Sequence, residues 1–122
     1  MTYKYFTIKE FDCKCGCGDN RIDPTLIEML DEARAIADIP FVITSGYRCP
    51  KHPESIKNPT SSHIKGLAVD IKCSESKPRA IMLDALAQVG FRRFGLAGKN
   101  KGNFLHTDID VLEKANPVIW LY

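Results

Sequence analysis

Two short segments that carry histidine and aspartate constrain the fold of this chain more than any other feature of the sequence. They are residues 63–70, which read HIKGLAVD, and residues 104–108, which read FLHTD. Two histidines and a carboxylate form a three-ligand set of the kind that holds catalytic zinc and leaves a fourth position for water. The fold must therefore bring His63, Asp70 and His106 to one point, and the sequence predicts a zinc-dependent hydrolase.

The spacing within these segments is compatible with such a convergence. In a strand over residues 104–109, side chains two apart share a face, so His106 lies on a polar face while the alternate residues face the core. Gly66 can supply the turn that brings His63, at the end of a loop, next to Asp70 on the following strand. A single histidine is most often an ordinary structural residue, but two histidines placed with an aspartate favour a metal site.

The rest of the chain alternates helical and strand patterns. Asp23 followed by Pro24 is a helix start signal, and Gly90 is a typical residue just after a helix end. Helices are expected at residues 7–11, 24–39 and 78–89, strands at 41–44, 67–71, 91–96 and 104–109, and a long loop at 45–62. His52 in that loop has no metal-binding partners, and we expect it to be structural or exposed. These elements predict one α+β domain over residues 1–122, with a small, mostly antiparallel sheet flanked by helices.

Length and charge exclude several classes of protein. The 122 residues fit a single domain, a monomer by default, and a net charge of +2 is too small for a nucleic-acid-binding protein. The most basic stretch contains Arg92, Arg93, Lys99 and Lys101, which we expect to form a solvated rim. The apolar runs are too short to cross a membrane, and no export signal begins the chain, so we expect cytoplasmic synthesis and no membrane partner.

The five cysteines are an odd number, so they cannot all pair within the chain, and a reduced state is the default. The alternate spacing of Cys13, Cys15 and Cys17 would put them on one side of an extended segment. We consider three interpretations: a buried reduced cluster, one disulfide to Cys49 or Cys73, and a structural metal site. Zinc knuckles usually separate paired cysteines by two to four residues, which favours the first two.

Four segments together carry a resemblance to a known family. They are residues 11–18 (FDCKCGCG), 43–50 (ITSGYRCP), 61–70 (SSHIKGLAVD) and 104–108 (FLHTD). In content and order they resemble the zinc D-Ala-D-Ala carboxypeptidase and peptidoglycan L,D-endopeptidase family, whose fold is shared with the Hedgehog signalling domain. The resemblance spans nearly the whole chain and implies that His63, Asp70 and His106 bind Zn²⁺. It also implies that Arg48 and Ser61 hold a carboxylate or the backbone of the substrate.

One position departs from the pattern of this family. Many relatives carry a catalytic aspartate or glutamate three residues before the last zinc histidine, where this chain has Asn103, whose amide cannot act as a base. Asp108 resembles the aspartate that one branch carries two residues after that histidine. We expect Asp108 to be the catalytic base, and the alternative is that it orients a ligand histidine. Arg48 is expected to assist by pairing with a substrate carboxylate, with a surface ion pair as the alternative.

The resemblance implies zinc-dependent hydrolysis of peptide bonds in bacterial peptidoglycan. We favour endopeptidase over carboxypeptidase action, in a phage or prophage lysis enzyme that is released to the cell wall. An inactive zinc-bearing binding module of the same fold is the main alternative, because of Asn103. A zinc-ribbon interaction protein built on the N-terminal cysteines is a weaker third interpretation.

Overall fold

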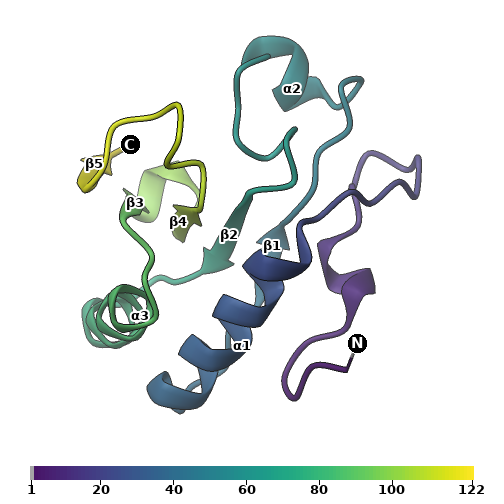
Figure 1. Cartoon of the computed structure of the whole chain (residues 1–122). Coiled ribbons are helices and arrows are strands. Elements are labelled where there is room, and N and C mark those ends of the chain that lie inside the picture. The colour runs from purple at the N-terminus through teal and green to yellow at the C-terminus, as the bar shows by residue number, and fades with distance from the viewer. Residues whose placement is uncertain (1) are drawn as a thin grey trace.

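A five-stranded sheet with the strand order β1-β2-β4-β3-β5 organises the computed structural model, which describes residues 2–122 (Figure 1). The strands are β1 (Ile43–Ser45), β2 (Ala68–Lys72), β3 (Arg93–Ala97), β4 (Phe104–Asp108) and β5 (Val118–Leu121). Neighbouring strands are antiparallel except β3 and β5, which are parallel. The predicted α+β class with a mostly antiparallel sheet is confirmed.

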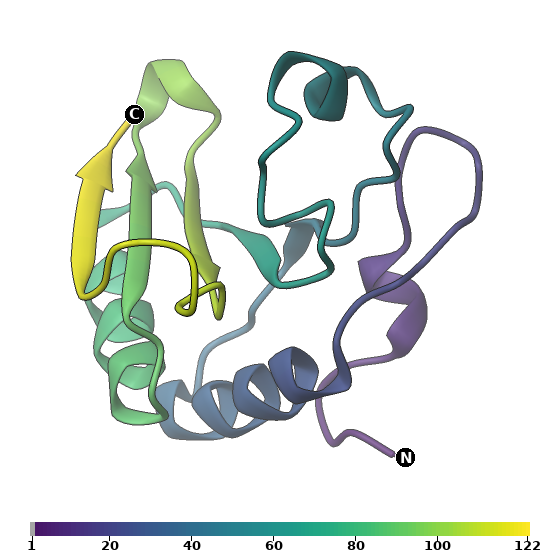
Figure 2. The ribbon, with the colours of Figure 1, turned by 45° about the horizontal axis from the view of Figure 1, so that its top comes forward.

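Two long helices pack side by side against the sheet (Figure 2). The helical elements are α1 (Pro24–Ala37), α2 (Pro53–Lys57) and α3 (Ser76–Gln88), with 3-10 helices η1 (Ile8–Phe11) and η2 (Lys99–Lys101). The long helix α1 begins as predicted, because the Asp23 carboxylate accepts the backbone N–H of Thr25 at 2.8 Å and Pro24 follows directly. The other long helix, α3, begins at Ser76, slightly before the predicted start.

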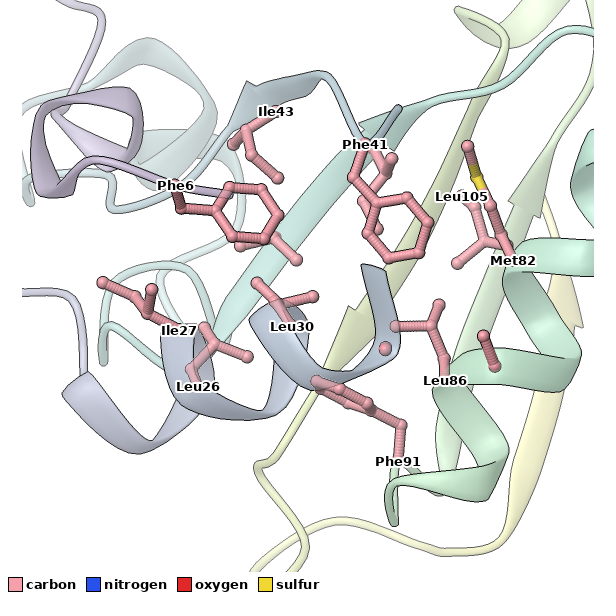
Figure 3. Packing of buried hydrophobic residues seen from close by; sticks show 14 of the residues in the cluster. Phe6, Leu26, Ile27, Leu30, Phe41, Ile43, Met82, Leu86, Phe91 and Leu105 are labelled. Atoms are coloured by element: carbon pink, nitrogen blue, oxygen red, sulfur yellow. The ribbon is translucent and has the colours of Figure 1, made fainter. Parts of the chain in front are cut away.

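The hydrophobic core lies between α1, α3 and one face of the sheet (Figure 3). Leu30 and Leu105 are fully buried there, and burying each such side chain stabilises the fold by about 1.5–3 kcal/mol. Val69 and Ile71 of β2 also belong to this cluster. Because side chains alternate along a strand, Asp70 between them points to the opposite face. That face is therefore free for polar residues.

The predicted loop over residues 45–62 contains a short helix, which corrects the expectation. The helix α2 begins after His52, whose Nδ1 accepts the backbone N–H of Glu54 at 3.0 Å. His52 is thus structural, as expected. The only buried residue of α2 is Ser55, so no apolar periodicity marks this helix in the sequence.

Two strands also differ from the expectation. The strand predicted at 41–44 is found at Ile43–Ser45, since its pairing with β2 begins where Ile43 faces Ile71. The sequence patterns do not predict β5, which pairs with β3 at the edge of the sheet. Within residues 2–122, none of the helices combines the length and apolar character that crossing a bilayer requires.

Candidate metal centre

The three predicted ligands come together on the polar face of the sheet. His63, Asp70 and His106 are all buried, and their ligand atoms lie within 4.8 Å of one another. Asp70 Oδ1 lies 3.0 Å from His106 Nδ1 and 3.3 Å from His63 Nε2. Asp70 on β2 and His106 on β4 are direct partners in the strand register, so the sheet itself places two of the three ligands.

The position of His63 depends on the turn that follows it. Gly66 has a φ of +72°, and a Cβ built there would lie 2.0 Å from the carbonyl oxygen of Arg21. The Gly66 carbonyl accepts the backbone N–H of Asp23 at 2.9 Å, which fixes the turn against the start of α1. Only glycine fits this conformation and this space, so Gly66 supplies the turn that the sequence predicts.

The tautomer of His63 follows from its hydrogen bond to the backbone. Its Nδ1 lies 2.7 Å from the carbonyl oxygen of Gly46, which can only accept, so Nδ1 carries the proton. In the neutral ring Nε2 is then unprotonated, and it faces Asp70 Oδ1 at 3.3 Å. A histidine that donates one ring N–H to a carbonyl and leaves the other nitrogen free is arranged for metal binding.

His106 is held in the same way by a side chain. Its Nε2 lies 2.8 Å from Asp108 Oδ2, while its Nδ1 faces Asp70 Oδ1. A carboxylate behind a metal-binding histidine is the usual partner that fixes the ring orientation. With its proton on Nε2, His106 presents an unprotonated Nδ1 to the point where the ligands meet.

The electrostatics of this point favour a bound cation. When the two ring nitrogens that face it, His63 Nε2 and His106 Nδ1, carry protons, they donate to Asp70. Burial alone would raise the pKa of Asp70, but these hydrogen bonds from His106 and His63 hold that pKa well below its usual range. Burial would lower the pKa of His106, but the carboxylates of Asp108 and Asp70 raise it. A divalent cation would take the place of the ring protons, bound by two nitrogen lone pairs and one carboxylate.

Asp108 is fully buried behind His106, and both of its oxygens are engaged. Oδ1 accepts Arg93 Nε at 2.8 Å and the backbone N–H of Asp110 at 3.1 Å, and Oδ2 contacts His106. Burial would raise the pKa of Asp108, but the hydrogen bond and charge of His106 lower it. These contacts are compatible with the alternative in which Asp108 orients His106, and its role as a general base stays a prediction.

The expected solvated rim is wrong for Arg93. Its side chain is 12% exposed, its Nε pairs with Asp108, and its guanidinium carbon lies 5.1 Å from the Trp120 ring centroid. Arg93 lies two residues before Gly95, the register partner of His106, and so shares the polar face of the sheet. The other members of the basic stretch are exposed, as expected: Arg92, Lys99 and Lys101.

Arg48 and Ser61 line the cavity beside the three ligands. Arg48 Nη2 donates to Asp70 Oδ2 at 3.1 Å and its Nε donates to Ser45 Oγ at 3.0 Å, with 17% of the side chain exposed. Arg48 thus forms an ion pair, but a largely buried one. The Ser61 hydroxyl accepts the backbone N–H of His63 at 3.2 Å. The roles of both residues toward a substrate stay predictions.

A cavity of about 460 Å³ opens at the three ligands. Its walls include residues that the sequence patterns do not single out, namely Glu54 and Asn58 near α2, and Trp120 and Tyr122 at the C-terminal end. The sequence pattern that could have indicated Trp120 and Tyr122 is the run over residues 118–121, whose β-branched and aromatic residues are typical of a strand.

Trp120 covers one side of His106. The two ring centroids are 5.3 Å apart, and the indole lies against β3 at Gly95. A Cβ at Gly95 would approach the indole to 2.6 Å, so glycine leaves the space that the ring needs. The edge strand β5 therefore contributes directly to the environment of a ligand histidine.

A protein-family model matches most of the chain. Its description is Peptidase M15, and the match runs over residues 4–108. The matched range contains the three candidate ligands together with Arg48 and Ser61, and it ends before β5. A comparison with curated proteins gave no match.

Proposed function

The chain belongs to the peptidase M15 family of metallopeptidases, and from this premise we propose that it is a zinc-dependent enzyme that cleaves peptide bonds in bacterial peptidoglycan. One observation carries the proposal: His63, Asp70 and His106 converge, buried, at a polar cavity large enough for part of a peptide. We further propose that the enzyme acts in cell lysis, as a phage or prophage protein that reaches the assembled wall.

The donor set fits zinc. Two imidazole nitrogens and one carboxylate oxygen are among the usual ligands of catalytic zinc, and three protein ligands leave a fourth position for water. When bound, zinc supplies a water whose pKa is lowered to about 7 and polarises the carbonyl of the bond to be cut. His63, Asp70 and His106 would hold the ion. The Gly46 carbonyl and the Asp108 carboxylate orient the two imidazoles.

The charges around the cavity support a substrate that carries carboxylates. Three cationic residues line it, namely Arg48, Arg93 and Lys114. Among the acidic residues of its wall, Glu54 is the one that contacts neither of the candidate ligand histidines. Peptidoglycan peptides contain free carboxylates, such as that of D-Glu. Cationic side chains attract these groups and orient them by charge-assisted hydrogen bonds.

The choice between endopeptidase and carboxypeptidase action depends on what Arg48 can bind. A carboxypeptidase must recognise the free C-terminal carboxylate, and arginine does this best with two parallel N–H donors. In this protein Nε of Arg48 is bound to Ser45 and Nη2 to Asp70. Two of the five guanidinium N–H donors are thus used inside the protein, and Nη1 and the second N–H of Nη2 are left to bind a substrate carboxylate. We propose endopeptidase action, which rates on free-acid and amide peptides distinguish from carboxypeptidase action.

Proton transfer requires a group that accepts the proton of the attacking water. We propose Asp108 for this role, as the sequence predicts, because it is an ionised carboxylate in the cavity wall. Glu54 is the competing acid, since it lines the same cavity with an exposed carboxylate. The variants Asp108→Asn and Glu54→Gln distinguish the two.

The proposal is tested by incubating the protein with purified peptidoglycan and identifying the released fragments by mass spectrometry. We expect new free termini at one peptide bond of the stem or cross-link, and none with the His106→Ala variant. The mass of the fragment identifies the peptide bond that was cleaved. Release of a terminal D-Ala alone would contradict endopeptidase action. Full metal occupancy without any hydrolysis would contradict the enzyme and favour the binding-module alternative.

A further inference from the structure

Four of the five cysteines lie together, outside the candidate metal centre. The sulfur atoms of Cys13, Cys15, Cys17 and Cys49 lie within 4.8 Å of one another, and we call this group the four-cysteine cluster. Figure 2 shows the N-terminal loop beside the loop that follows β1, where Cys49 lies. Cys73 packs in the hydrophobic core instead, so the interpretation of a disulfide to Cys73 is wrong.

The distances within the four-cysteine cluster match a shared metal ion. The sulfur of Cys15 lies 3.5 Å from that of Cys13 and 3.4 Å from that of Cys49. A tetrahedron with zinc–sulfur bonds of about 2.3 Å has sulfur–sulfur edges of about 3.8 Å. A disulfide would need about 2.05 Å. The spacing is therefore close to that of ligands around one ion.

A turn, and not the expected extended segment, brings the N-terminal cysteines together. Residues 14–17 form turns, and Gly16 and Gly18 have φ values of +101° and +71°. A Cβ at either glycine would meet nothing within 4 Å, so the glycines serve the backbone conformation and not the packing. They let the chain reverse between cysteines that are only two residues apart, which makes this spacing compatible with a metal site.

Backbone N–H groups point at two of the sulfurs. Cys49 N–H donates to the Cys13 sulfur and Asp19 N–H to the Cys17 sulfur, each at 3.3 Å. Such N–H donors stabilise a sulfur that carries negative charge, which is the form in which cysteine binds a metal. Crowded thiolates repel one another unless a cation lies between them.

We propose that the four-cysteine cluster binds a structural zinc ion as a tetrathiolate site, separate from the candidate metal centre. Four protein ligands complete a tetrahedral shell and leave no position for water, which is the pattern of a structural site. Tetrahedral sulfur ligation selects zinc or iron, and a hydrolase has no need of the redox chemistry that iron would add.

The proposed site would brace the candidate metal centre through a shared segment, residues 46–49. Cys49 directly follows Arg48, and the Gly46 carbonyl accepts a hydrogen bond from Nδ1 of His63. Tyr47 between them packs with Cys13 and Cys49, and its N–H donates to the Phe11 carbonyl at 2.9 Å. Fixing Cys49 to the N-terminal loop therefore fixes the backbone that orients His63 and carries Arg48.

The test is metal analysis of protein purified under reducing conditions. We expect two zinc ions per chain in the wild type and one in each of Cys17→Ser, Cys15→Ser and His106→Ala. The matched control is Cys73→Ala, which removes a cysteine outside the cluster and should keep both ions. Because Cys15 and Cys17 are exposed, their replacement leaves the core intact, and circular dichroism checks the fold.

A second measurement identifies the ligands directly. In the His106→Ala background, cobalt bound in place of zinc should show thiolate-to-cobalt charge-transfer absorption, and Cys17→Ser should abolish it. The proposal is overturned if the wild type holds one zinc per chain and His106→Ala removes it completely, or if the cluster holds iron in place of zinc. It is also overturned if the mass of the freshly purified, intact protein shows a disulfide. Immediate reaction of all five cysteines of the folded wild type with a thiol reagent would also overturn it, because it would mean that none of them is bound to a metal.

Discussion

Asp70 and His106 face each other directly in the register of β2 and β4, with Asp70 Oδ1 3.0 Å from His106 Nδ1. A slip of one residue between these strands would send one ligand to the opposite face of the sheet. Val69 and Ile71 on either side of Asp70 are fully buried, so the same slip would expose them. The hydrophobic core thus fixes the register that brings the two ligands together.

Asp108→Asn separates the two roles considered for this carboxylate. If Asp108 is the base, zinc affinity stays the same while the rate falls by about 10²–10⁴-fold. If it orients His106, we expect zinc affinity to fall by about 10–100-fold. Zinc titration of the variant, together with its turnover at saturating zinc, measures the two effects independently.

Glu54→Gln is the matched comparison for this experiment. Glu54 lines the same cavity, but its side chain is exposed and contacts Lys57 and not a ligand histidine. We expect this variant to keep its zinc and most of its turnover. A large loss of turnover in Glu54→Gln, with near-normal turnover in Asp108→Asn, would assign the base to Glu54.

Arg48 distinguishes the two peptidase modes. An endopeptidase cuts within a chain, so amidating the distant C-terminus of a peptide substrate should change the rate little. For a carboxypeptidase the same change leaves Arg48 facing a neutral group, at a cost of about 2–5 kcal/mol. Rates on matched free-acid and amide peptides, for the wild type and Arg48→Ala, provide the measurement. Strong sensitivity to amidation that disappears in Arg48→Ala would reject the endopeptidase assignment.

The stability of the protein should depend on pH through Asp110. This buried carboxylate accepts Ser62 Oγ at 2.8 Å and Lys65 Nζ at 3.1 Å. Burial would raise the pKa of Asp110, but these hydrogen bonds and the charges of Lys65 and Lys114 lower it. A depressed pKa stabilises the folded state above the unfolded pKa, and the stabilisation is lost as the pH falls through the folded pKa. We expect Asp110→Asn to be less stable at neutral pH and to lose less Tm than the wild type on acidification.

Glu113→Gln serves as the control for Asp110. Glu113 contacts the same Lys65 nitrogen at 2.9 Å, but its side chain is 75% exposed. Exposed ion pairs contribute about 0–1 kcal/mol, so its Tm curve against pH should follow that of the wild type. Parallel curves for the wild type and Asp110→Asn would show that Asp110 does not cause the acid sensitivity.

Gly66→Ala should displace His63. The added methyl group would meet the Arg21 carbonyl, and the positive φ alone costs alanine about 1–3 kcal/mol. We therefore expect a lower Tm and weaker zinc binding at the candidate metal centre. Gly98→Ala is the control, since a Cβ there would meet nothing within 4 Å. Unchanged zinc affinity in Gly66→Ala would mean that the turn does not position His63.

The sequence predicts the metal ligands because their local patterns have strong physical causes. Alternation along residues 104–108 puts Leu105 in the hydrophobic core and His106 on the opposite, polar face, and Gly66 is required by a close backbone contact. The start of α1 is equally readable, since Asp23 caps it. The strand alternation and the helix cap depend on neighbours in the sequence. Glycine by itself signals a turn, although the contact that requires Gly66 is with the distant Arg21.

The features that the sequence does not predict depend on distant contacts. Trp120 reaches His106 only because β5 pairs in parallel with β3, which no nearby residue specifies. The five-residue helix α2 buries a single serine and so lacks periodicity. The burial of Arg93 likewise depends on Asp108, a partner on another strand.

The two candidate ligand histidines differ in how directly a substitution can disturb the orientation of the ring. The group that orients His106 is the side chain of Asp108, which a single codon change removes. The group that orients His63 is the peptide carbonyl of Gly46, and every amino acid brings the same carbonyl. Substitution can affect it only by moving the chain, as a Cβ at Gly46 would by meeting the Phe11 Cα at 2.7 Å. The orientation of His63 is therefore inherited with the path of the backbone, and a substitution disturbs it only where it shifts that path.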